Sequence, residues 1–166
     1  MRVLKLLALL AALTAATAAA AQAQVGPPWG PETGHFNLQA ILRPAAGGPD
    51  EGFGLVKFRQ PNDADKVVYL DVSVRNLAPN HSYYLQRATD TSVDDDCTGT
   101  NWLTLGHGLT LVAITTDDRG TGRAQLFRDL AALPAGVQFD IHFRVLDAAT
   151  TAVVLESGCY QFTVSQ

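Results

Sequence analysis

Residues 66–77 alternate apolar and polar side chains more clearly than other stretches, and this alternation constrains the fold more than any single motif. In the segment KVVYLDVSVRNL, one set of alternate positions holds Val68, Leu70, Val72 and Val74. The intervening positions hold Tyr69, Asp71, Ser73 and Arg75. A period of two predicts a β-strand with one buried face and one solvated face.

A second strand of this kind is predicted at residues 137–147, VQFDIHFRVLD. Its expected inward positions are Val137, Phe139, Ile141, Phe143 and Val145. Shorter β-type runs, separated by turn residues, fill most of the remaining chain. We predict them at 36–43, 53–60, 81–88, 101–106, 109–116, 123–130 and 152–166.

These eight or nine runs predict one all-β domain over residues 35–166. The only helical candidate beyond residue 34, LFRDLAAL, is short and lies among β-type runs. Brief connections favour antiparallel pairing, so we expect a single antiparallel Greek-key β-sandwich of about eight strands. VRNLAPNHSYYL and FRDLAALPAGVQFDI resemble each other, which would place two similar turns at equivalent corners. Recurring turn chemistry is the alternative explanation of this echo.

The N-terminal residues have the pattern of a secretory signal peptide. Arg2 and Lys5 precede a run of Leu and Ala that is short for a membrane span, and the small residues of AQA (21–23) follow it. We therefore expect a signal peptide over 1–23, a Pro/Gly-rich leader over 24–34 and a secreted or periplasmic protein. An N-terminal membrane anchor is the alternative.

The charge of the exported chain limits its partners. The full chain has a net charge of −4, and removal of Arg2 and Lys5 would make it −6. An acidic average disfavours nucleic acid, whose phosphates require a basic surface. No later segment is apolar enough for membrane insertion. We expect an extracellular or periplasmic partner, whose identity the sequence does not specify.

Cys97 and Cys159 are the two cysteines of the chain. In an exported protein, two thiols most simply form one disulfide bond. Two unpaired buried thiols are the alternative, and a metal site is disfavoured because the cysteines are far apart and form no CxxC motif.

The segment SVDDDCTGTN (92–101) concentrates oxygen donors. Calcium binds six to eight oxygens, which makes Asp94, Asp95 and Asp96 weak calcium candidates. The segment lacks the EF-hand order, so we favour a solvated acidic loop and expect no metal or other cofactor. In the segment NHS (80–82), Asn80 also fits an N-glycosylation sequon.

Catalytic motifs are not evident. The chain has neither GxSxG nor HExxH, and its one notable pair is Asp140 and His142, two apart on one strand face. A triad can assemble from distant residues, but nothing in the sequence indicates one. We therefore expect no enzymatic activity.

Leu77, Pro79 and Tyr83 have the spacing of a structural corner in fibronectin type III and related immunoglobulin-like domains. In that corner the Leu fills the core, the Pro fixes the turn and the Tyr hydroxyl bonds back to the backbone. The motif is short, so this resemblance is the weaker of two.

A wider resemblance runs from about Gly54 to the C-terminus, where the chain resembles a shortened copper/zinc superoxide dismutase-like β-sandwich. GLVKFRQ resembles an early strand of that family, and VSVRNLAPNHSYYLQ resembles the approach to its HGFHVH-type ligand strand. CTGTNW and SGCYQFTVSQ resemble the segments that carry its disulfide. The resemblance implies that Cys97 and Cys159 lie on facing segments.

The metal ligands of that family are missing here. Its two copper ligands on the ligand strand would fall at Tyr84 and Gln86, and its bridging ligand at Leu103. His142 would fall near another copper ligand, but one imidazole does not hold a redox-active copper. The resemblance thus implies the fold without the metal chemistry.

We interpret the chain as a secreted, non-enzymatic β-sandwich module with a binding or structural role. Its candidate contact surface consists of Tyr69, Asp71 and Arg75, with Tyr84 and His142. His81 is interpreted as a turn residue. The alternative is a divergent dismutase-like metalloprotein that uses His35, His81, His107 and His142.

The signal-peptide interpretation predicts that the mature protein starts at Gln24, directly after AQA. N-terminal sequencing of the exported protein measures this. Retention of Arg2 in the exported chain would show that no signal peptide is removed.

Overall fold

The computed structural model describes residues 36–165, and every regular element in this part of the chain is a β-strand. The predicted signal peptide (1–23), the leader (24–34) and His35 lie outside these residues. No helix that could cross a membrane occurs in residues 36–165. The all-β prediction is confirmed.

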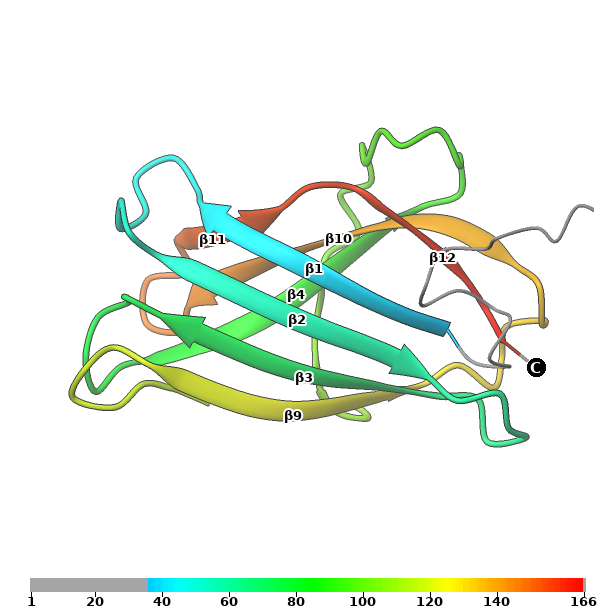
Figure 1. Cartoon of the computed structure of the whole chain (residues 1–166), viewed down its shortest axis with the longest axis horizontal. Helices are drawn as coiled ribbons and strands as arrows, with labels where there is room; N and C mark the ends of the chain where they lie inside the picture. The colour runs from blue at the N-terminus through cyan, green and yellow to red at the C-terminus, as the bar shows by residue number, and fades with distance from the viewer. Residues whose placement is uncertain (1–35, 166) are drawn as a thin grey trace, which may run out of the picture.

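The longer strands form two layers (Figure 1). The front layer, in the order β1-β2-β3-β9, contains β1 (Phe36–Pro44), β2 (Phe53–Gln60), β3 (Val67–Arg75) and β9 (Gly122–Asp129). The back layer contains β4 (Ser82–Asp90), β10 (Gln138–Asp147), β11 (Val153–Ser157) and β12 (Tyr160–Thr163). β10 pairs antiparallel with β4 on one side and with β11 and β12 on the other.

The two layers are the two halves of one nearly closed sheet. On one side, β11 pairs with β1, from Leu42 opposite Ser157 to Pro44 opposite Leu155. On the other side, β4 and β9 do not pair directly, and we call this boundary the seam. Four short strands cross it. They are β5 (Leu103–Thr104), β6 (Gly106–His107), β7 (Thr110–Leu111) and β8 (Ile114–Thr115).

The seam is bridged at one end and in its middle. At one end β8 pairs with β4, and the next residue, Thr116, bridges to Gly122 of β9. In the middle, β5 pairs with β4 while β6 pairs with β9. The predicted strands 101–106 and 109–116 are therefore broken into short pieces, because the same segment must pair with both layers in turn. The result is twelve strands in a nearly closed sheet rather than a clear eight-strand sandwich.

The echo in the sequence corresponds to two arches that cross between the layers. Residues 76–81 join β3 to β4, and residues 130–137 join β9 to β10. The Leu77 N–H donates to the Gly120 carbonyl at 3.2 Å, and the Leu130 N–H donates to the Lys66 carbonyl at 3.0 Å. Each acceptor stands shortly before the neighbouring strand and has a positive φ, 73° at Gly120 and 50° at Lys66. Equivalent turns thus occupy equivalent corners at opposite ends of the antiparallel β3–β9 pair.

The core lies between the layers, on the faces that the alternation predicted. Val68, Leu70, Val72 and Val74 are between 2% and 3% exposed. On β10, Ile141, Phe143 and Val145 are buried as well. Val137 and Phe139 are only half-buried because they line a cavity at that end of the barrel.

The first arch contains the corner that its sequence predicted. The Tyr83 hydroxyl accepts a hydrogen bond from the Ala78 N–H at 3.0 Å, and Leu77 is 6% exposed. Burial raises the pKa of Tyr83 above its ordinary value. A Cβ at Gly120 would lie 2.1 Å from the Leu77 carbonyl oxygen, so only glycine fits against this corner.

One disulfide bond joins Cys97 to Cys159, with Cα atoms 5.3 Å apart. Cys159 lies between β11 and β12, and Cys97 lies in the loop that follows β4. The sequence separation is 62 residues. Closing a loop of that length stabilises the fold by about 4 kcal/mol in the chain-entropy description.

We predict that Tyr83→Phe lowers the free energy of unfolding by about 1–2 kcal/mol, because the part-buried Ala78 N–H loses its acceptor. Urea unfolding of the purified protein measures this. Tyr84→Phe, one residue along the same strand, is the matched control and should change stability by less than about 0.5 kcal/mol. Equal effects of the two substitutions would contradict the structural role of the corner.

Candidate functional site

The outer face of the front layer carries four rows of side chains that run across the strands. The strand register places them opposite one another. The rows are Arg43–Phe53–Arg75, Ile41–Leu55–Ser73–Arg123, Gln39–Lys57–Asp71–Gln125 and Asn37–Arg59–Tyr69–Phe127. We call this surface the basic face. Neighbouring strands lie about 4.8 Å apart and successive rows about 6.8 Å apart, so it measures about 15 by 20 Å.

Positive charge is concentrated on the basic face. Its exposed basic side chains are Arg43, Lys57, Arg59, Arg75 and Arg123. They are half of the ten Lys and Arg residues that follow Lys5. Within residues 36–165 the one ion pair joins His81 to Asp147, so no carboxylate neutralises these five cations at ion-pair distance.

Three of these arginines stack on aromatic rings. The guanidinium carbons of Arg75 and Arg43 lie 4.4 Å and 5.3 Å from the centroid of Phe53. Arg59 lies 5.5 Å from the centroid of Tyr69. Stacking of this kind orders a guanidinium while its N–H groups stay available to an acceptor. Phe53 and Tyr69 therefore support cations and are not themselves the bare platforms of a stacking site.

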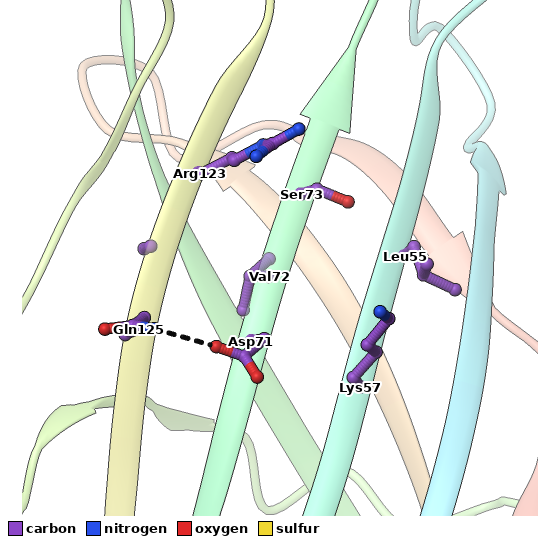
Figure 2. A pocket seen from close by; sticks show the side chains of 8 residues that line it. Leu55, Lys57, Asp71, Val72, Ser73, Arg123 and Gln125 are labelled. Atoms are coloured by element: carbon purple, nitrogen blue, oxygen red, sulfur yellow. Dashed lines mark hydrogen bonds between the residues drawn. The ribbon is translucent and has the colours of Figure 1, made fainter.

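A shallow hollow of about 520 Å³ lies at the centre of the basic face. Figure 2 shows Lys57 on β2, Asp71 and Ser73 on β3, and Arg123 and Gln125 on β9 around it. The Gln125 side chain donates a hydrogen bond to Asp71 Oδ1 at 3.2 Å (Figure 2). The hollow thus combines two cations with hydroxyl, amide and carboxylate groups.

The contact surface predicted from the sequence is divided between the two layers. Tyr69, Asp71 and Arg75 lie on the basic face. Tyr84 and His142 lie on the outer side of the back layer, on β4 and β10. The prediction of one joint surface was wrong, because the arch at 76–81 carries the chain from one layer to the other. The outward basic residues of β1, β2 and β9 were missed, although the same alternation would have identified them.

The outer side of the back layer is covered by its own side chains. The Trp102 ring lies 4.5 Å from the His142 ring and 3.9 Å from the Arg144 guanidinium carbon. Arg144 Nε donates to Gln86 Oε1 at 2.8 Å, and Gln86 Nε2 donates to Thr104 Oγ1 at 2.8 Å. Two of the positions that resemble metal-ligand positions, Gln86 and His142, therefore contribute to a stacked, hydrogen-bonded surface. Leu103 is part of β5 and packs against the core.

The three described histidines have separate partners. His107 stacks on Phe127 and contacts the Gln125 carbonyl oxygen at 2.9 Å. His142 Nε2 lies 3.0 Å from the Gly99 carbonyl oxygen. His81 Nε2 lies 2.7 Å from Asp147 Oδ2. In residues 36–165, no group of three His, Cys, Asp or Glu side chains is placed to hold a metal ion.

His81 lies in the first arch, next to the start of β4, and pairs with the turn between β10 and β11. Asp147 Oδ1 accepts the N–H groups of Ala149 at 2.8 Å and Thr150 at 2.9 Å. His81 is thus a partly exposed turn residue, as the sequence indicated, and it ties the arch to a second turn. Asn80 is exposed in the same arch.

The acidic loop at residues 92–101 is hydrogen-bonded to a buried carboxylate of β10. Asp140 is 0% exposed, and its Oδ2 accepts the N–H groups of Asp94 at 3.0 Å and Asp95 at 2.9 Å. Asp94 Oδ1 accepts the Asp96 N–H, and Asp95 Oδ1 accepts the Gln161 amide. The structure does not gather the three weak calcium candidates into a metal site. The sequence placed Asp140 on one strand face with His142 but did not predict its burial under this loop.

Comparison of the chain with protein-family models, curated proteins and solved structures found no significant match. The surfaces of the molecule are therefore the basis of its proposed function.

Hydrogen bonding lowers the pKa of Asp147 below its ordinary value, with the Thr150 N–H as the largest cause. A depressed carboxyl pKa stabilises the fold above the unfolded-state pKa of about 3.9, and this contribution is lost as the pH falls through the folded-state value. We predict that the stability of Asp147→Asn decreases less than that of the unmodified protein as the pH falls below about 4. Thermal unfolding between pH 2 and pH 7 measures the difference.

The control is Asp118→Asn, which makes the same change in the exposed turn before β9. It should keep the acid dependence of the unmodified protein. Identical pH profiles for the two substitutions would refute the role assigned to the Asp147 turn.

Proposed function

We propose that this protein is an exported, non-enzymatic binding module whose basic face binds an extended acidic polysaccharide. The observation that carries the proposal is the concentration of five exposed cations, none of them in an ion pair, on one sheet face of an otherwise acidic protein. The disulfide bond is compatible with an extracellular or periplasmic location.

The geometry of the face favours a chain-like ligand over a compact anion. The cations are spread over all four strands and over rows that span about 20 Å. No two of them converge on a single enclosed pocket, because the hollow at the centre is shallow and open. A ligand that contacts several of them must therefore be extended and carry repeated negative charges.

The centre of the face favours a sugar polymer over an acidic polypeptide. Asp71 stands between Lys57 and Gln125 in the third row. A carboxylate there repels the negative charges of any acidic chain, but it accepts hydrogen bonds from sugar hydroxyls, which an acidic polypeptide such as polyglutamate lacks. The Ser73 hydroxyl and the Gln125 amide can also form hydrogen bonds with sugar hydroxyls. Uronic-acid units supply both the hydroxyls and the carboxylates that such a surface can bind.

The net negative charge is an average over the chain and does not apply to the basic face. The acidic average disfavours nucleic acid, and single-stranded DNA has no free hydroxyl groups along its chain to donate to Asp71 at the centre. The face itself is basic, however, so single-stranded DNA must be included as a competitor in the test.

We also propose that the chain has a Greek-key plan of about eight strands related to the dismutase-like β-sandwich, without its metal chemistry. The two arches between layers and the disulfide between the β4 loop and the last strands support this reading. The metalloprotein alternative requires histidines that converge, whereas His81, His107 and His142 each have a separate partner.

Binding to immobilised polygalacturonate tests the proposed function. We predict saturable binding that weakens with added salt and exceeds binding to neutral dextran, polyglutamate or single-stranded DNA. The double substitution Lys57→Gln with Arg123→Gln should weaken binding at least about tenfold, since each removes a charged hydrogen-bond donor.

Arg119→Gln is the matched control, because Arg119 is an exposed arginine in the turn before β9 and lies off the basic face. It should leave the affinity within about twofold. Tighter binding to polyglutamate or DNA, or an equal loss for the control and the double substitution, would overturn the proposal.

A further inference from the structure

A second cavity lies inside the barrel, at the end of the seam that no strand bridges. Its volume is about 270 Å³, and it opens between the ends of β4 and β9 near the second arch. Its walls come from both layers and are mainly apolar. They include Val68, Leu70, Leu105, Ile141, Phe143 and Phe162. This cavity is separate from the basic face, because it lies on the inner side of the same strands.

Two arginines line this cavity from core-facing positions. Arg87 of β4 stands opposite Phe143, which is 1% exposed, and Arg128 of β9 stands opposite Val68, which is 2% exposed. Residues directly opposite in an antiparallel pair lie on the same face of the sheet, so both arginines share the face of the core. Charged residues are uncommon at such positions unless they have partners.

No carboxylate compensates these two charges within residues 36–165. One Arg87 nitrogen donates to Thr89 Oγ1 at 3.2 Å, and one Arg128 nitrogen donates to the Gly108 carbonyl at 3.1 Å. Each guanidinium has further N–H groups, since it carries five in all. Both side chains line the same cavity. Burial lowers the pKa of Arg87, and the charge of Arg128 lowers it further.

We propose that this cavity binds a small amphiphile with an anionic head, specifically a free medium-chain carboxylate. The carboxylate accepts hydrogen bonds from Arg87 and Arg128, and the aliphatic tail fills the apolar space between the layers. The volume corresponds to about nine water-sized groups, which is the size of a chain of roughly eight carbons. Local departures from the packing pattern, such as two facing arginines in a core, are typical of functional sites.

A bound carboxylate stabilises the cavity in two ways. A carboxylate between two guanidinium groups offsets their mutual repulsion and accepts two charge-assisted hydrogen bonds. The tail removes apolar surface from water inside a preformed space, which favours binding by about fourfold for each methylene group. The site depends on neither sugars nor the basic face, so it goes beyond the function proposed above.

Isothermal titration of the full exported protein with octanoate tests this site. We expect saturable binding of one molecule, weaker binding of hexanoate and butanoate in that order, and at least tenfold weaker binding of octylammonium, which has the same tail and the opposite charge. Failure of octanoate to bind, or equal binding of octylammonium, would overturn the proposal. Preference for vesicles of anionic phospholipid over free octanoate would also overturn it.

The substitutions Arg87→Gln and Arg128→Gln should each weaken octanoate binding at least tenfold. Arg123→Gln is the matched control, since it makes the same change on the outer side of β9, and it should leave octanoate binding unchanged. The tail-length series with the unmodified protein remains decisive if either cavity substitution fails to fold. Loss of octanoate binding in Arg123→Gln but not in Arg128→Gln would contradict the inference. Failure of the protein to bind polygalacturonate while it still binds octanoate would contradict only the proposed function.

Discussion

Incomplete closure of the sheet between β4 and β9 is the constraint on which the rest of this structure depends. The opposite boundary closes by direct pairing of β1 with β11. At the seam, a single segment must pair alternately with both layers, through β5, β6 and β8. Leu105 lies between β5 and β6, is 3% exposed and fills the gap in the middle. Beyond it the layers stay apart, and the interior becomes a cavity.

Hydrogen bonds and one disulfide bond stabilise the loops around this nearly closed sheet. The corner hydrogen bonds of Leu77 and Leu130 fix the arches that carry the chain between layers. The Cys97–Cys159 bond and the buried Asp140 carboxylate fold the acidic loop against the back layer. With these loops held, the outer side of the back layer is occupied by Trp102 and its partners, and the front layer remains as the open surface.

The strands and their buried faces followed from the sequence, because a period of two directly reports which side of a strand meets the core. The Tyr83 corner and the disulfide were also predictable, since each depends on few residues with a definite geometry. The alternation was enough to identify the outward basic residues, but their gathering on one face depends on the register of four strands, which no single sequence reveals. Arg87 and Arg128 interrupt the apolar alternation of their strands, and that interruption was the available signal for the cavity.

The central claim is that one barrel presents two independent sites on opposite sides of the same strands. Amide chemical-shift mapping by NMR, with octanoate and with short galacturonate oligomers added to the same protein, tests it most directly. The account predicts that octanoate shifts the amides of Arg87, Leu105 and Arg128, while the oligomers shift those of Lys57, Asp71 and Arg123. Shifts of one common set of amides by both ligands, or shifts confined to the back layer, would contradict it.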